Sequence, residues 1–186
     1  MPNDTVRFAA FMRAINVGKR RVKMAALIEH VEALGFVDVQ TLIASGNVAF
    51  SAPENQSVDD VRVNFDGGLS ERLGFEVVSA FRTPAEIDEV IAAEPFGAPG
   101  DPGWTDDDVV HVSFLLGEPA PEAAERLAAL DTPEDRFAIV GRELYWRRRG
   151  KLSESPHFAT NFAKLLGVES TARRLDTVVR MRPLLR

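Results

Sequence analysis

Short runs of apolar residues alternate along the chain with segments in which apolar residues recur every three or four positions. Short runs predict β-strands, whereas the three-and-four spacing predicts helices that bury one face. In the first half the predicted order is βαββαβ, with strands at 6–12, 37–44, 48–51 and 75–81 and helices over 24–34 and 58–73. This order is that of the ferredoxin-like split unit.

The second half repeats most of this order. The pattern predicts strands at 109–116, 136–140 and 143–147, and helices over 121–130, over 155–166 and from about 172 to a stop near Pro183. Between the halves, 84–93 is predicted to be a short helix, and 95–103 contains three prolines and three glycines. We therefore predict an α+β protein of two ferredoxin-like halves with antiparallel sheets and a C-terminal helix, divided into 1–94, a linker at 95–107, and 108–186.

The composition narrows the class of protein. The 186 residues are 45% apolar and include no cysteine, which fits a reducing compartment and excludes thiol nucleophiles, iron–sulfur clusters and thiolate zinc sites. The apolar run ending at Met12 is too short to span a membrane, and no other stretch approaches about 18 apolar residues. The three histidines form no metal motif. We expect a cytoplasmic location, no membrane contact, no metal and no cofactor.

Charge is distributed unevenly along the chain. The total of −6 combines +2 for residues 1–50, −16 for 51–135 and +8 for 136–186. Basic ends favour an anionic partner, because a basic face raises the local potential whatever the total charge. The alternative is that the acidic middle folds back and neutralises the ends within one molecule.

The loop between the first strand and the first helix is one candidate for anion binding. Arg13, Asn16, Gly18 and Lys23 combine a glycine turn with positive side chains just before a helix, where free N–H groups point at an anion. The loop lacks the flanking glycine and the hydroxyl residue of a Walker motif. The alternative is a solvated basic loop.

The turn between the second and third strands holds two further candidates. Gly46 and Asn47 after Ser45 are typical of a hairpin turn. Ser45 is not in a nucleophile elbow, because Ile43 and Asn47 replace both of the glycines that this motif requires. Turn chemistry explains the segment, and Asn47 can also orient a ligand.

Tyr145, Arg147 and Arg149 are candidates for nucleic-acid contacts. Rings stack on bases and guanidinium groups pair with phosphates. Strand alternation places Leu144 and Trp146 toward the core and Tyr145 with Arg147 outside. The segment matches no ribonucleoprotein signature, so the candidate depends on the interleaving of aromatic residues with arginines.

The last predicted helix carries Arg173, Thr177 and Arg180 at i, i+4 and i+7, which places them on one face. Two arginines flanking a hydroxyl can grip a phosphate or carboxylate. The alternative is a solvated face on which Asp176 pairs with Arg180.

Two groups of residues resemble the signatures of a bacterial family. The first is Arg13-Ala-Ile-Asn-Val-Gly18, Lys23-Met24 and Thr41-x-x-x-Ser45-Gly46-Asn47-Val48-x-Phe50. The second is Ser155, Lys164-x-x-Gly167-x-x-x-Thr171-x-Arg173 and Thr177-Val178. Together they are similar to the family catalogued as domain of unknown function 1697, over essentially the whole chain.

This resemblance implies a duplicated α/β architecture and a single-chain bacterial cytosolic protein. It supplies no catalytic residue, cofactor or substrate. Ala14 stands where glycine is common, which predicts a less tight loop. Arg174, Leu175 and Asp176 replace a typical Asn-Trp-Asn, so any ligand contact of that triplet is changed here.

We predict a binding module for a phosphate-bearing or nucleic-acid ligand, held in a basic groove formed by both ends of the chain. Its predicted anion-binding residues are Arg13, Asn16, Gly18, Lys23, Ser45, Asn47, Lys164, Thr171, Arg173 and Thr177. One alternative is an enzyme acting on a small anionic metabolite, with a general base among His30, Asp38, Glu169 and Asp176. The other is a protein–protein adaptor. The sequence leaves open whether the chain is a monomer or a dimer.

Overall fold

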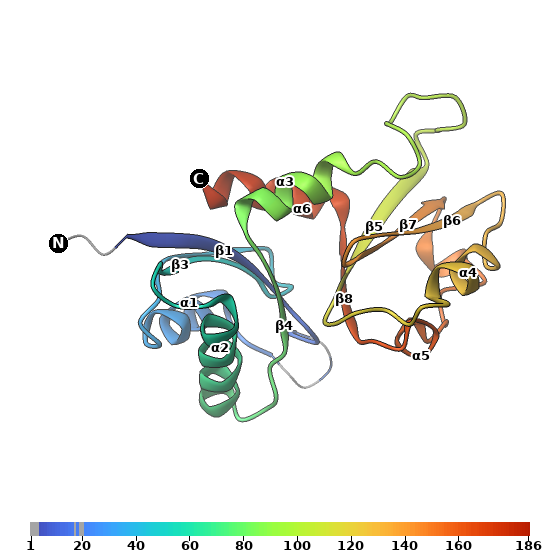
Figure 1. Ribbon diagram of the computed structural model, residues 1–186. Helices are drawn as coiled ribbons and strands as arrows, with labels where there is room; N and C mark the ends of the chain where they lie inside the picture. The colour runs from blue at the N-terminus through green and yellow to red at the C-terminus, as the bar shows by residue number, and fades with distance from the viewer. Residues whose placement is uncertain (1–3, 17, 19–20) are drawn as a thin grey trace. The chain divides into compact units, whose positions relative to one another are not determined.

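The computed structural model describes residues 4–16, 18 and 21–186 (Figure 1). The chain forms two compact units. One contains the described residues up to Asp88 together with Arg180–Arg186, and the other contains Glu89–Val179. Each unit has the order βαββαβ and one four-stranded antiparallel sheet, which confirms the predicted α+β fold with two similar halves.

The first unit has strand order β2-β3-β1-β4. Its elements are β1 (Thr5–Met12), α1 (Met24–Glu32), β2 (Val37–Leu42), β3 (Asn47–Pro53), α2 (Val58–Leu73) and β4 (Ser79–Arg82). Between the helices and the sheet lies an apolar core that is rich in phenylalanine. Phe50 stacks on Phe65 with ring centroids 5.1 Å apart, and Phe81 meets Phe65 edge-on at 5.2 Å. Such aromatic pairs add about 1 kcal/mol beyond the area they bury.

Local signals fix α2 where the periodicity predicts it. Ser57 caps the helix start by accepting a hydrogen bond from the Asp60 N–H at 3.1 Å. Gly74 ends the helix with φ +73°, a left-handed conformation that suits glycine. The strand predicted at 75–81 is shorter than expected, since β4 pairs with β1 only from Ala9 to Met12.

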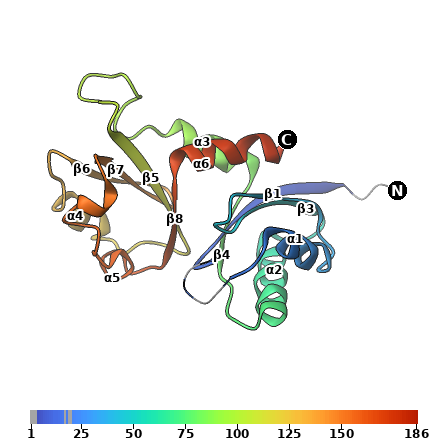
Figure 2. The same cartoon turned by 180° about the vertical axis from the view of Figure 1, so that it is seen from behind.

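The second unit has strand order β6-β7-β5-β8, the same topology as the first. Its elements are β5 (Asp108–Leu115), α4 (Ala123–Ala128), β6 (Asp135–Val140), β7 (Glu143–Arg149), the 3₁₀-helix η1 (Leu152–Glu154), α5 (Phe162–Leu166) and β8 (Ser170–Arg174). In both views α4 and α5 lie on one face of this sheet (Figure 2). Beneath them, Leu115, Leu127, Phe137, Leu144 and Leu166 form the core.

Two helices predicted here begin later along the chain than expected. Residues 155–161 form turns, and only Phe162–Leu166 is helical, so Phe158 is 60% exposed rather than part of an apolar helix face. Residues 170–174 form β8, which pairs with β5 from His111 to Leu115. Sheet pairing overrides the helix propensity of Ala-Arg-Arg here, because it satisfies the backbone groups along the β5 edge.

Two helices carry the chain between the units. The unit boundary falls within α3 (Pro84–Ala92) and again within α6 (Leu175–Met181). The 3₁₀-helix η2 (Arg182–Leu185) follows α6 and packs against β1 and β3 of the first unit. Arg7 on β1 donates a hydrogen bond to the Leu184 carbonyl, and Arg182 pairs with Asp88 at 2.5 Å. The segment predicted to be a linker lies within the second unit as a series of turns.

Candidate functional site

In the first unit, Asn16 ties the predicted anion loop to the β2–β3 hairpin. Its Nδ2 donates to the Ala44 carbonyl at 2.8 Å, and its Oδ1 accepts from the Val22 N–H at 2.8 Å. Asn16 has φ +58°, and asparagine tolerates this left-handed conformation better than most residues. These contacts give Asn16 a structural role in closing the loop.

The turn at Gly46 packs directly against the end of β1. Its carbonyl accepts a hydrogen bond from the Met12 N–H at 2.8 Å. A Cβ at Gly46 would lie 2.9 Å from the Met12 Cβ, so only glycine fits. Buried Asn47 donates from Nδ2 to the Leu42 carbonyl and to the Ser45 Oγ, each at 2.9 Å. The structure therefore brings the two parts of the first signature together through packing and turn geometry.

The remaining first-unit candidates, Arg13, Gly18 and Lys23, are exposed. Lys23 immediately precedes α1, whose first turn contains no acidic residue and whose first N–H groups receive no side-chain cap within the part of the chain that the structure describes. An uncapped helix start favours negative charge. Val17, Lys19 and Arg20, which lie in the same loop, fall outside the described residues.

In the second unit, three of the four predicted anion-binding residues are buried or partly buried rather than exposed. Lys164 is exposed on α5, as expected for a surface cation. Arg173 lies on β8 rather than on a helix, so it does not share a helix face with Thr177. Its guanidinium donates to the Thr171 Oγ1 at 2.8 Å and to the Ala172 carbonyl at 2.7 Å, and burial lowers its pKa to about 10. Thr171 and Thr177 are buried.

The expectation that Tyr145 and Arg147 lie outside is wrong. Tyr145 is 1% exposed, and its hydroxyl donates to the Val90 carbonyl at 2.9 Å. Arg147 is also buried. Leu144 and Trp146 pack into the core on the opposite face as predicted, so both faces of β7 are covered. Arg149 is half-buried and donates to the Gly103 carbonyl at 2.8 Å.

Asp135 is a buried hub that the sequence analysis did not identify. Its Oδ1 accepts from the Trp146 Nε1 at 2.8 Å and from the Ser155 Oγ at 3.1 Å, and its Oδ2 pairs with Arg148 at 2.8 Å. Thr132 caps the same strand start by accepting from the Asp135 N–H at 2.9 Å. These bonds explain why Ser155 faces inward.

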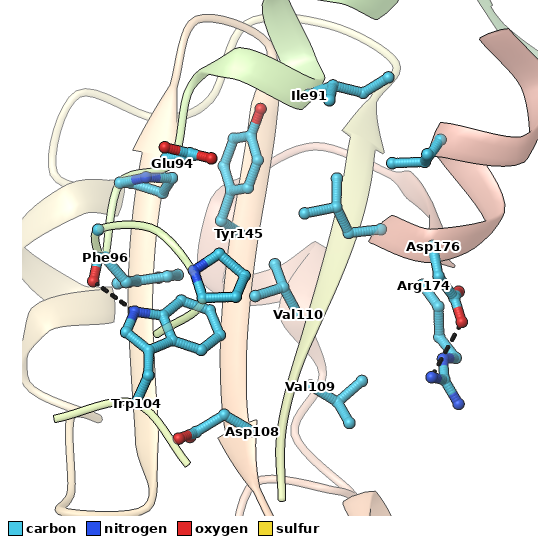
Figure 3. A pocket seen from close by; sticks show the side chains of 15 residues that line it. Ile91, Glu94, Phe96, Trp104, Asp108, Val109, Val110, Tyr145, Arg174 and Asp176 are labelled. Carbon is cyan, nitrogen blue, oxygen red and sulfur yellow. Dashed lines mark hydrogen bonds and ion pairs between the residues drawn. The ribbon is translucent and has the colours of Figure 1, made fainter. Parts of the chain in front are cut away.

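A pocket of about 370 Å³ lies within the second unit (Figure 3). The turns after α3, the start of β5, Tyr145 of β7 and the start of α6 form its walls. Its lining residues are Ile91, Glu94, Pro95, Phe96, Gly97, Pro99, Trp104, Asp108, Val109, Val110, Tyr145, Arg174, Leu175, Asp176 and Val179. Figure 3 shows the rings of Phe96 and Trp104 on one side and Arg174 with Asp176 on the other.

The rings of Phe96 and Trp104 form an aromatic wall of the pocket, and polar contacts behind this wall hold it in place. The Trp104 Nε1 donates to the Phe96 carbonyl at 3.1 Å, which joins the two ring residues (Figure 3). The Arg147 guanidinium lies over both rings, 5.3 Å from the centroid of Trp104 and 5.9 Å from that of Phe96. Cation–π contacts of a desolvated arginine contribute roughly 1–2 kcal/mol. The wall is therefore formed before a ligand arrives.

Asp108 lies at the base of this wall with an inaccessible side chain. Its Oδ2 accepts from the Thr105 N–H at 2.7 Å and from the Thr105 Oγ1 at 3.0 Å, and lies 3.4 Å from Arg149. Burial alone would raise the pKa of Asp108, but the bonds from Thr105 and the charges of Arg147 and Arg149 outweigh it and hold the pKa below its ordinary value. The Asp108 Oδ1 is 3.6 Å from the Arg147 Nε, too far for a hydrogen bond.

Two further charged features line the pocket. Arg174 pairs with Asp176 at 3.0 Å, and both side chains are more than half exposed. Glu94 is exposed and has φ +36°, in the left-handed region. Within the described residues, its carboxylate makes no hydrogen bond or ion pair. The sequence signal for this site was present in the Pro- and Gly-rich segment before Trp104, which we interpreted as a linker.

Residues 6–145 match the family model described as a protein of unknown function, DUF1697. The chain belongs to this family. The match to the DUF1697 model includes the first signature and ends before the second. Arg174, Leu175 and Asp176, which lie beyond this match, all line the pocket.

Among solved structures, this DUF1697 protein resembles the conserved bacterial protein SP0830 from Streptococcus pneumoniae, with a TM-score of 0.71 and 18% sequence identity. The alignment covers 98% of this chain and 100% of that chain, and at this identity it shows a shared fold. No curated protein matches the chain. Within the described residues, no helix is long and apolar enough to cross a membrane, and no group of three or more acidic or histidine side chains is arranged to hold a metal ion.

Proposed function

We propose that this DUF1697 protein binds a small, ring-bearing organic molecule in the pocket of its second unit. The observation that carries the proposal is the pocket itself, whose volume of about 370 Å³ suits a small ligand. Most of its lining is apolar, and Phe96, Trp104 and Tyr145 supply three rings. Offset stacking on such rings favours a planar ligand.

Preorganisation supports the same proposal. Trp104 is held by the Phe96 carbonyl and by Arg147, and the Tyr145 hydroxyl is held by the Val90 carbonyl. A ligand that enters this pocket orders few side chains, which reduces the entropic cost of binding.

A binding role is better supported than an enzymatic one. Of the four residues predicted as general bases, only Asp176 lines the pocket. Its carboxylate pairs with Arg174 at 3.0 Å, which holds it as an ion-pair partner. Asp108 is likewise compensated by two arginines. Catalysis therefore stays a prediction that no contact in the pocket supports, and the cytoplasmic location stays a prediction as well.

Titration of ring compounds against the intact chain tests the proposal. Indole and adenosine are added to isotope-labelled protein, and amide shifts are followed at Val109, Val110 and Leu175. We expect saturable shifts with a Kd of about 1 mM or tighter for at least one compound. Leu175→Trp fills the pocket and should abolish them, whereas Val140→Trp at an exposed position on β6 should not. Non-saturable shifts, or equal binding by Leu175→Trp, contradict the proposal.

Binding of a phosphate-bearing ligand or nucleic acid is a second candidate function. It is favoured by exposed Arg13 and Lys23 beside the uncapped start of α1. The groove that joins both ends of the chain stays a prediction, because its residues belong to separate units. Anisotropy of a labelled single-stranded oligonucleotide at two salt concentrations tests it. Phosphate contacts require affinity to fall steeply with salt. An absence of binding at low salt, or no effect of Lys23→Gln, removes this candidate.

A further inference from the structure

The charges around the pocket are unequally compensated. Four charged residues line it: Glu94, Asp108, Arg174 and Asp176. Arg174 and Asp176 neutralise each other, and Asp108 is compensated by Arg147 and Arg149 behind the wall. The Glu94 carboxylate has no partner within the described residues. Of the charged side chains that line the pocket, Glu94 is therefore the one without a protein partner among the described residues.

The hydrogen-bonding groups of the pocket point to the same ligand chemistry. The Asp108 side chain is fully inaccessible, and its Oδ1 accepts no hydrogen bond from any residue that the structure describes. A buried carboxylate oxygen without a donor is costly to leave unsatisfied. The Tyr145 hydroxyl already gives its proton to the Val90 carbonyl, so toward a ligand it can only accept. Asp108 and Tyr145 are enclosed by the protein, so the exposed carboxylate of Glu94 is the acceptor that this pocket offers to a donor of the ligand.

The rings favour positive charge as well. The faces of Trp104 and Phe96 already attract one cation, the Arg147 guanidinium. Ring faces are electron-rich, so an ammonium or guanidinium group gains energy beside them where an anion does not. The aromatic wall and the free carboxylate therefore select the same sign of charge.

The backbone at Glu94 has a conformation that is uncommon for glutamate. Glu94 follows α3 with φ +36°, and its carbonyl accepts from the Gly97 N–H at 2.9 Å. Glycine or asparagine would adopt this left-handed conformation more easily than glutamate. The turn nevertheless carries a long side chain with a carboxylate beside the pocket.

We infer that the ligand of this pocket is a ring-bearing organic cation, with its ammonium or guanidinium group bound by Glu94 and its ring by the wall of Phe96 and Trp104. This inference rests on the proposed function and adds the chemical class of the ligand. Glu94 is then the residue that sets specificity for charge. An aromatic amine of this size fits the volume of about 370 Å³.

Three indoles that differ only in the charge of the side chain provide the test: tryptamine, neutral tryptophol and indole-3-acetate. Calorimetric titration of the intact chain at neutral pH should give about tenfold tighter binding for tryptamine than for tryptophol, and the weakest binding for the acetate. The tryptamine preference should shrink in high salt, because Glu94 is exposed and screened.

Variants assign the preference to Glu94. Glu94→Gln should reduce tryptamine affinity to that of tryptophol and leave tryptophol unchanged, whereas Glu118→Gln, another exposed acid of the second unit, should change neither. Glu94→Asn removes the charge while suiting the left-handed backbone, so it should lose the preference in a protein at least as stable. Tryptophol binding without a tryptamine preference, or a preference that survives Glu94→Gln, overturns this inference and leaves the proposed function intact. Failure of all three indoles to bind contradicts both.

Discussion

The two units share one topology and differ in what covers the start of their first strand. In each sheet the fourth strand pairs only with the later part of the first, from Ala9 in β1 and from His111 in β5. In the first unit, η2 covers β1, and Arg7 bonds the Leu184 carbonyl. In the second unit, the turns after α3 approach the start of β5 and leave a pocket. The comparison shows how one fold has a covered strand in one unit and a pocket in the other.

The buried interiors differ in the same way. The first unit fills the space under its helices with a phenylalanine cluster. The first unit also buries the charged side chain of Arg82, and the second buries the ion pairs of Asp135 with Arg148 and of Asp108 with Arg147. Apolar packing stabilises the folded state through close contacts that have no fixed partner atoms. Buried ion pairs hold two side chains in one geometry, and removing one partner is costly. We therefore expect the first unit to fail through lost packing and the second through lost polar partners.

The largest effect is expected from Phe65→Ala in the first core. Phe65 is fully buried between Phe50 and Phe81, so truncation leaves a cavity and should lower the free energy of unfolding by about 4 kcal/mol. Urea denaturation measures the loss. Val63→Ala on the same helix, where the side chain is 65% exposed, is the control and should cost less than about 0.5 kcal/mol. An equal loss in both variants would contradict the packing account.

The next effect is expected from Asp135→Ala in the second unit. The substitution leaves Arg148 buried without its carboxylate and removes acceptors for Trp146 and Ser155, which should cost about 3 kcal/mol. Glu134→Ala, at the neighbouring exposed position, is the control. A loss below about 1 kcal/mol in urea denaturation would show that the hub does not hold this unit together.

Acidification should change the stability contributed by one carboxylate in each unit in opposite directions. Burial raises the pKa of Asp66 on α2 above its ordinary value, so the folded state holds the proton more firmly, and stability from this residue rises as pH falls through the folded pKa. The pKa of Asp108 is lowered, so its contribution is present above the unfolded pKa of about 3.9 and is lost as pH falls further.

Melting temperatures between about pH 3 and pH 7 check these signs. In the wild-type protein Asp66 should raise the melting temperature on mild acidification, and Asp66→Asn should remove this rise because an amide cannot take up the proton. The gap between the wild-type protein and Asp108→Asn should be constant near neutrality and close below about pH 4. If the difference in melting temperature between the wild-type protein and Asp108→Asn widened in acid, the direction given for the Asp108 pKa would be wrong.

The smallest effects are expected at two of the non-glycine residues that have positive φ, one taken from each unit. Ala14 has φ +54°, and Glu94 has φ +36°. Ala14→Gly and Glu94→Asn should each stabilise by about 1 kcal/mol or less, because glycine and asparagine adopt this conformation more readily. Urea denaturation measures both. Ala98→Gly, in a turn of the second unit where φ is negative, should instead destabilise slightly.

Local patterns predicted most of the fold because its elements have local causes. The helix over 58–73 has buried residues at Val61, Phe65 and Leu69, a serine cap and a glycine stop, all readable along the chain. The strand β8 was missed because its stabilisation comes from pairing with β5, which lies more than 50 residues earlier in the sequence. The helix-favouring residues of this segment led to a helix prediction, because the pairing with β5 cannot be read from the sequence.

The pocket was missed for a related reason. Glu94, Trp104, Tyr145 and Leu175 come from four separated segments, and nothing in the spacing of the sequence joins them. Tyr145 and Arg147 were placed outside because alternation distinguishes the two faces of a strand but does not show that both are buried. Asn16 and Asn47 were predicted to bind an anion, and their hydrogen bonds close the loop and the turn; anion binding by them stays a prediction.

The discontinuous make-up of the first unit has a consequence for the order of events during synthesis. Its closing piece, Arg180–Arg186, leaves the ribosome only after every residue of Glu89–Val179. The uninterrupted second unit can thus mature while its host still waits for η2 to reach β1 and for Arg182 to reach Asp88. Until then the surface of β1 and β3 that packs against η2 stays uncovered.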